Sequence, residues 1–158
     1  MEPDQYVRKQ IVKHLKGGEA FMPVDRMLDE MPYEKAGEVP EGLPYSFWQQ
    51  LYHLRYTQKD ILDFSKSADY TAPAWPDDYW PEQAAPHNRQ EWDETIAAYK
   101  RERDELAGLV GDTSNDLYQP FDHGKGQTLL REALLVVEHS AYHTGQMLVI
   151  MRLLGLHD

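Results

Sequence analysis

The chain has 158 residues, a formal net charge of −11 at pH 7 and no cysteine. We expect one domain over residues 1–158, because a chain of this length can bury a sizeable core. The negative charge disfavours binding to a nucleic acid. The absence of cysteine excludes disulfides, a thiolate nucleophile and a cysteine-ligated metal.

The first ten residues, MEPDQYVRKQ, lack the apolar core of a signal peptide. The most apolar run, residues 128–154, is interrupted by charged residues and histidines and does not have the pattern of a membrane span. Together with the lack of cysteine, these features predict a soluble cytoplasmic protein with no membrane partner.

Apolar residues with a helical period first occur in residues 4–16, and the glycine pair that follows predicts the end of that helix. A short helix is expected within residues 20–31, with Asp25 as its N-terminal cap. Residues 33–44 are rich in Gly and Pro and are expected to form a loop.

A second long helix is expected from Ser46 to about residue 67. Ser46 and Gln49 have the capping-box pattern, in which the serine accepts a backbone N–H and the glutamine reaches back. The face of this helix that carries His53 is polar for a core, since it also carries Gln49, Tyr56, Thr57, Asp60 and Phe64. That face is therefore a candidate for function.

Residues 67–87 contain four prolines and a dense aromatic set, which consists of Tyr70, Trp75, Tyr79 and Trp80. Proline fixes the backbone without forming a helix, and loops of this length are usually either functional lids or disordered. The aromatic side chains favour a packed lid over a disordered linker.

Two more long helices are expected, from Asn88 to Val110 and from Thr128 to Leu154. We find no alternating strand pattern. The sequence thus predicts an all-α four-helix bundle with a long Pro- and aromatic-rich loop between the second and third helices. The last helix is apolar nearly all round, so we expect it to be buried on most sides and to take part in a homodimer.

His139 and His143 lie four residues apart on the last helix, so their imidazoles share one face. Imidazole binds Zn, Ni, Fe and Cu, and bundle cores hold metal sites built from facing helices. A third ligand is needed, and His53 is the only histidine on another long helix with a suitable face. Three histidines would leave a coordination position open for water or substrate.

Other interpretations stay open at this point. The segment HSAYH lacks the glutamate of the metalloprotease motif, so the spacing does not specify a reaction. The imidazoles could simply form hydrogen bonds in the core. Arg103 is expected to pair with a buried carboxylate. Three polar residues share faces with the histidines and could orient them: Asp60, Glu132 and Gln146.

The segment EHSAYHTGQ, preceded by TLLREALL and followed by MLVIMRLLG, resembles the last helix of the DinB-like (DinB/YfiT) family. The segments LPYSFWQQLYHLRYTQKDILDFS, YWPEQAAP and GGEAF also resemble that family. The resemblance implies a bundle, usually dimeric, in which three histidines hold a divalent metal. The matching positions here are His53, His139 and His143, and Zn²⁺ or Ni²⁺ is the expected ion.

Some members of that family resemble metal-dependent S-transferases that use low-molecular-weight thiols, others resemble thiol-dependent maleylpyruvate isomerases, and many have no known reaction. The resemblance thus implies a metal-dependent thiol S-transferase acting on a small-molecule substrate, with a low-molecular-weight thiol as a second cofactor. Two alternatives are a non-catalytic, stress-related bundle that binds a metal or small molecule, and a metal-dependent hydrolase.

Overall fold

The computed structural model describes residues 2–158. Within that range the chain forms five α-helices and no β-strand, which confirms the all-α prediction. Their bounds are Pro3–Lys16 (α1), Val24–Glu30 (α2), Phe47–Lys66 (α3), Arg89–Gly111 (α4) and Leu129–Leu153 (α5). Two 3₁₀ turns, Tyr33–Lys35 (η1) and Asp77–Tyr79 (η2), lie in the connections. Over the same residues, no helix combines the length and apolar character needed to cross a bilayer.

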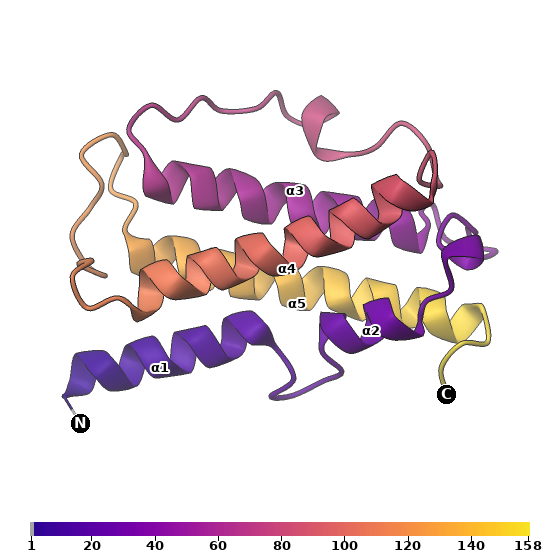
Figure 1. Ribbon diagram of the computed structural model, residues 1–158, viewed down its shortest axis with the longest axis horizontal. Coiled ribbons are helices and arrows are strands. Elements are labelled where there is room, and N and C mark those ends of the chain that lie inside the picture. Colours follow the sequence, from indigo (N-terminus) through magenta and orange to yellow (C-terminus); the bar gives the residue numbers. More distant parts are fainter. Residues whose placement is uncertain (1) are drawn as a thin grey trace.

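The four long helices pack side by side, with α3 against α4 and α5, and α1 against α4 and α5. Figure 1 shows that α1 and α5 run in one direction and α3 and α4 in the other. Because α3 and α4 are parallel neighbours, the chain between them must return the full length of a helix. Residues 67–88 make that return along the outside of α3 (Figure 1). The topology thus accounts for the length of the loop.

α3 begins at the predicted capping box, and α4 begins directly after Asn88, where the sequence predicted its start. Ser46 accepts from the backbone N–H of Gln49, whose side chain accepts from the Ser46 N–H, so the capping box is present. Asn88 accepts from the Glu91 N–H at the start of α4. The cap predicted for α2 is wrong, because Pro23 occupies that position and makes no side-chain cap.

Asp25 has a different role from the one expected. Its two carboxylate oxygens accept hydrogen bonds from Arg103 at 2.7 and 3.1 Å. The Arg103 side chain is only 7% exposed, and a buried guanidinium requires a counter-charge. Asp25 therefore ties α2 to α4. Arg103 has the carboxylate partner that the sequence predicted, but the Asp25 side chain is 40% exposed and not buried as expected.

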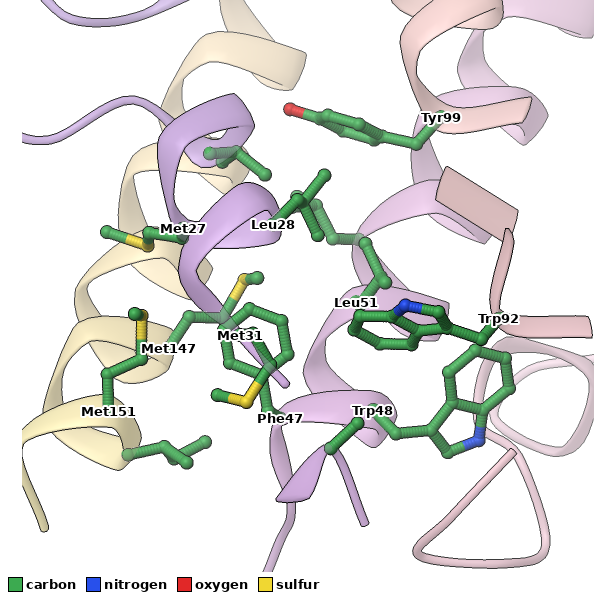
Figure 2. Packing of buried hydrophobic residues seen from close by; sticks show 14 residues of the cluster. Met27, Leu28, Met31, Phe47, Trp48, Leu51, Trp92, Tyr99, Met147 and Met151 are labelled. Carbon is green, nitrogen blue, oxygen red and sulfur yellow. The ribbon is translucent and has the colours of Figure 1, made fainter. Parts of the chain in front are cut away.

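Two separate hydrophobic clusters make up the core. The first lies around α2 and the adjoining ends of α3, α4 and α5. Figure 2 shows Met27 of α2 and Met31, the residue after α2, close to Met147 and Met151 of α5, with the indoles of Trp48 and Trp92 on the far side. The second cluster joins α1 to the opposite ends of the other long helices.

Buried polar residues lie between these clusters on each of three helices. On α4, Glu102 and Arg103 separate Tyr99 of the first cluster from Leu106 of the second. On α5, His143 and Thr144 are buried between Val136 and Met147, and on α3 Gln58 is buried between Leu54 and Ile61. A polar layer thus crosses the middle of the bundle.

In the single chain, the burial of α5 is incomplete. Five large apolar side chains lie 36% exposed or more along about one third of its circumference: Leu134, Leu135, Tyr142, Val149 and Leu153. The opposite side of α5 packs against α3 and α1, so the bundle itself covers only part of the apolar surface that the sequence provides.

Candidate metal centre

Three histidines converge between α3 and α5. His53 comes from the middle of α3, and His139 and His143 come from consecutive turns of α5. Ring nitrogens of all three lie within 4.8 Å of one another, and the Nε2 atoms of His53 and His139 are 3.0 Å apart. His53 and His143 are buried, whereas His139 is half-buried and is the most accessible of the three.

Hydrogen bonds from the surrounding protein orient two of the rings. The Nδ1 atom of His53 lies 3.1 Å from the carbonyl oxygen of Tyr79, and Nδ1 of His143 lies 2.6 Å from Oε1 of Gln50. Because each partner is an oxygen acceptor, each Nδ1 must carry the proton and donate it. The Nε2 atoms of both rings are therefore unprotonated and free to accept a proton or bind a metal.

Burial lowers the pKa of all three imidazoles. The pKa of His143 falls to about 3 and that of His139 to about 4, first because both are buried and then because the neighbouring histidines repel a second charge. Burial also lowers the pKa of His53, and its bond to Tyr79 acts in the opposite direction. All three rings are therefore neutral at pH 7, which is the state that binds metal.

The chain that connects α3 to α4, residues 67–88 (the crossover segment), covers His53. The indole of Trp80 stacks on the His53 ring, with 3.8 Å between ring centroids and 2° between planes. Trp75 approaches the same ring edge-on at 6.3 Å and is itself 69% exposed. Tyr79 contributes the carbonyl that accepts from His53. Three aromatic residues of the predicted lid, Trp75, Tyr79 and Trp80, thus approach the His53 ring, whereas Tyr70 packs against Phe64.

Asp60 of α3 holds this segment in place. Its two carboxylate oxygens accept hydrogen bonds from the hydroxyls of Tyr70 and Tyr79, both at 2.6 Å. Burial and the bond to Asp60 raise the pKa of both phenols, so they stay protonated and keep donating. Asp60 is therefore a partner of the lid and makes no direct bond to a histidine.

The three histidines fit a metal ion. Two ligands on a tetrahedral ion with metal–nitrogen distances of about 2.0–2.1 Å lie about 3.3 Å apart, close to the separation between His53 and His139. All three rings are neutral. On His53 and His143, the Nδ1 atom is already held by a hydrogen bond to the surrounding protein. An all-imidazole donor set suits Zn²⁺ and the other late first-row metals.

Among the remaining candidates from the sequence, Gln146 contributes to the site. The carboxylate of Glu132 pairs with Arg131. The side chain of Gln146 acts on His143 through a hydrogen bond that partly opposes the lowering of the His143 pKa. The rings of Tyr56 and Phe64 pack against other aromatics and do not fill the space between the histidines. Met147 is fully buried in the first hydrophobic cluster.

Gln50 and the Tyr79 carbonyl were not anticipated. Gln50 lies one turn before His53 and is fully buried, with Gln49 before it and Leu51 after it in the sequence. Its position three residues after Phe47 and four before Leu54 puts its amide on the apolar face of the helix, and this is the signal that could have identified it, because a buried amide needs a polar partner. A backbone carbonyl leaves no such signal in the sequence.

The fold and the site define a helical bundle with a three-histidine group that could hold a metal ion. The family model of the DinB superfamily matches residues 20–147, which is most of the chain. The chain therefore belongs to the DinB superfamily. Comparison with curated proteins and with solved structures gave no match.

Proposed function

We propose that the protein is a metal-dependent enzyme, a thiol S-transferase, in which His53, His139 and His143 bind a divalent metal, Zn²⁺ or Ni²⁺. One observation carries the proposal, namely the convergence of three neutral imidazoles from two helices, two of them fixed through Nδ1. Structural histidines in a core seldom need this arrangement, whereas metal ligands are usually oriented by such outer hydrogen bonds.

A metal bound there would lower the pKa of a coordinated thiol and so supply a thiolate near neutral pH. The protein residues would have three tasks. His53, His139 and His143 hold the ion, Gln50 and the Tyr79 carbonyl set the direction of two rings, and the indole of Trp80 keeps water from one face of His53. His139, the half-buried ligand, marks the side from which substrate approaches.

The first test is metal content, measured by elemental mass spectrometry on tag-free protein. We expect close to one ion per chain in the wild type, loss of the ion in His53→Ala, and retention in the control His14→Ala, which removes an exposed histidine of α1. Wild-type protein that is metal-free after incubation with Zn²⁺ and Ni²⁺ would refute the proposal.

The second test is reaction of a thiol with 1-chloro-2,4-dinitrobenzene. The thiolate sulfur forms the new bond to the ring carbon, chloride leaves, and the thiol proton passes to buffer. We expect a rate with metal-loaded wild type above that of His53→Ala. Turnover of activated esters without thiol transfer would favour the hydrolase alternative. Bound metal with neither activity would favour a non-catalytic binding bundle.

We also propose that the protein is a single-domain homodimer in the cytoplasm. The exposed apolar stripe of α5 supports the dimer, because a two-fold axis beside that helix would bury the same stripe on both copies. The absence of cysteine supports a reducing compartment. Light scattering at micromolar concentration tests the oligomeric state.

A further inference from the structure

A cavity lies beside the candidate metal centre, and Trp80 is part of its wall. It has a volume of about 340 Å³ and lies between α3, the crossover segment and the start of α4. This volume is at the lower end of the range of about 300–1,000 Å³ that is typical of ligand pockets. Trp80 faces both sites, since its indole stacks on His53 and also lines the cavity.

Aromatic rings form much of the wall. Tyr52 and Tyr56 are one turn apart on α3, and their rings are nearly parallel, with 16° between planes and 6.0 Å between centroids. Trp48 meets Tyr52 edge-on at 5.9 Å and extends the same wall into the core. Together with Trp80, these residues give the cavity an electron-rich aromatic surface.

The polar part of the wall is mostly acidic, and it also contains His87, whose Nδ1 lies 2.9 Å from a carboxylate oxygen of Glu91. Four carboxylates line the cavity, and none of its lining side chains, taken from residues 2–158, is a lysine or arginine; the carboxylates are Asp77, Asp78, Glu82 and Glu91. Burial raises the pKa of the Tyr52 hydroxyl, and the charges of Glu91 and Asp78 raise it further. Arg55 lowers it, but the Arg55 guanidinium is already held by Glu102 through two hydrogen bonds.

We propose that this cavity binds an alkylated ammonium group, such as a trimethylammonium, through the aromatic wall and the carboxylates around it. The faces of Trp and Tyr rings attract cations, and weakly hydrated alkylammonium ions gain most from such a surface. The carboxylates supply the counter-charge. A neutral apolar group of the same shape would gain only the contact with the rings, and an anion would be repelled.

The proposal also names a substrate class. If the metal centre is catalytic as proposed above, a substrate or thiol bearing an alkylammonium group would place that group in the cavity, with Trp80 between the group and the metal ligands. This assignment rests on the proposed function. Binding of the cation itself does not, because the cavity contains none of the three histidines.

The test uses choline and its neutral carbon isostere 3,3-dimethylbutan-1-ol, titrated at constant ionic strength into the full chain, metal-loaded and after treatment with EDTA. Binding is followed through the indole N–H signals in the NMR spectrum. We expect choline to bind at least about tenfold more tightly than the isostere, with the largest shift at Trp80. The anion 3,3-dimethylbutanoate should not bind.

Two variants locate the site. Glu82→Gln removes one charge from an exposed position, and Tyr52→Leu removes a ring from the wall; both should weaken choline binding several-fold. The control Asp93→Asn changes the net charge equally at an exposed position of α4 outside the cavity and should leave binding unchanged. Because Glu82 is exposed, its substitution tests the proposal even if Tyr52→Leu fails to fold.

Several outcomes would overturn the proposal. These are equal affinity for choline and the isostere, no choline binding at 100 mM, or binding that both variants leave unchanged. Failure of the metal proposal is distinguishable, since choline would then still bind to a protein that takes up no metal. Conversely, metal-loaded protein that does not bind choline would refute only the proposed cation site.

Discussion

The side-chain oxygen of Gln50 lies 2.6 Å from Nδ1 of His143, and both residues are buried. This contact fixes the tautomer of His143 and the direction of its Nε2. Replacement by an apolar side chain of similar size removes the acceptor, so the ring is free to rotate. We expect Gln50→Leu to weaken metal binding about 10–100-fold, the usual effect of losing an outer partner of a metal ligand.

A competition titration against a chromogenic chelator measures this affinity. The matched control is Gln58→Leu on the same helix. Gln58 is equally buried, and its amide donates to the Tyr99 carbonyl, away from the histidines. Gln58→Leu should lower stability and keep the affinity for metal, and equal losses in both variants would show that Gln50 acts only through the fold.

Removal of metal should lower thermal stability only when the histidines are intact. A ligand that binds the folded state adds RT ln(1 + [L]/Kd), or about 4 kcal/mol at a thousandfold excess over Kd. We expect EDTA to lower the Tm of the wild type and to leave that of His139→Ala unchanged. His123→Ala, a change in an exposed loop, should behave as the wild type. An EDTA effect that persists in His139→Ala would contradict the ligand assignment.

Loss of the Asp60 carboxylate should loosen the crossover segment. Asp60→Asn keeps one acceptor but cannot accept well from both Tyr70 and Tyr79, and hydrogen bonds to a charged group contribute about 1.5–3 kcal/mol each. We expect faster hydrogen exchange in residues 68–82 and a loss of about 1–3 kcal/mol in the free energy of unfolding. Asp63→Asn, which breaks only a surface pair with Lys59, should change neither.

Acid should destabilise the metal-free protein through its histidines. In the folded state the pKa of His139 is about 4 and that of His143 about 3, below the ordinary value of 6.5. At a pH between the folded-state pKa values and 6.5, the unfolded chain binds more protons than the folded chain. The free energy of unfolding therefore falls as the pH drops from about 6.5 toward 4. Thermal denaturation between pH 7 and 5 should show this slope, and a shallower one in His139→Gln. Equal slopes would mean that His139 does not contribute.

The exposed stripe of α5 should control assembly. If two copies meet there, a charge in the stripe would be buried without a partner, which the dimer cannot accommodate. We expect Val149→Glu to be a monomer by light scattering, and Val39→Glu, a similarly exposed valine in a loop, to remain a dimer. A wild type that is monomeric at micromolar concentration would remove the basis for this proposal.

The helices were predictable because the signals that define them are local. Ser46 with Gln49, Asn88 with Glu91, and the glycines after α1 mark ends that the structure reproduces within one or two residues. The directions of the helices were not predictable from the sequence. The directions depend on which neighbouring helices are parallel. The long connection between α3 and α4 can be interpreted as a sign of parallel helices only when the topology is known.

The histidines were brought together as expected, since a spacing of four on one helix and a polar face on another are visible in the sequence. Their partners were harder to identify. Asp25 looked like a helix cap, but pairing with Arg103 dominated because burying a guanidinium alone costs more than an uncapped turn. The Tyr79 carbonyl depends on how the crossover folds back, which no local pattern encodes.

The polar layer between the two hydrophobic clusters affects how the molecule unfolds. Each cluster has its own apolar contacts. In the layer between the two clusters, the buried side chains of the helices are polar. The two ends of the bundle can therefore lose structure at different temperatures in the absence of metal. An ion held by His53 on α3 and by His139 and His143 on α5 would join the two ends, and unfolding would then become a single cooperative event.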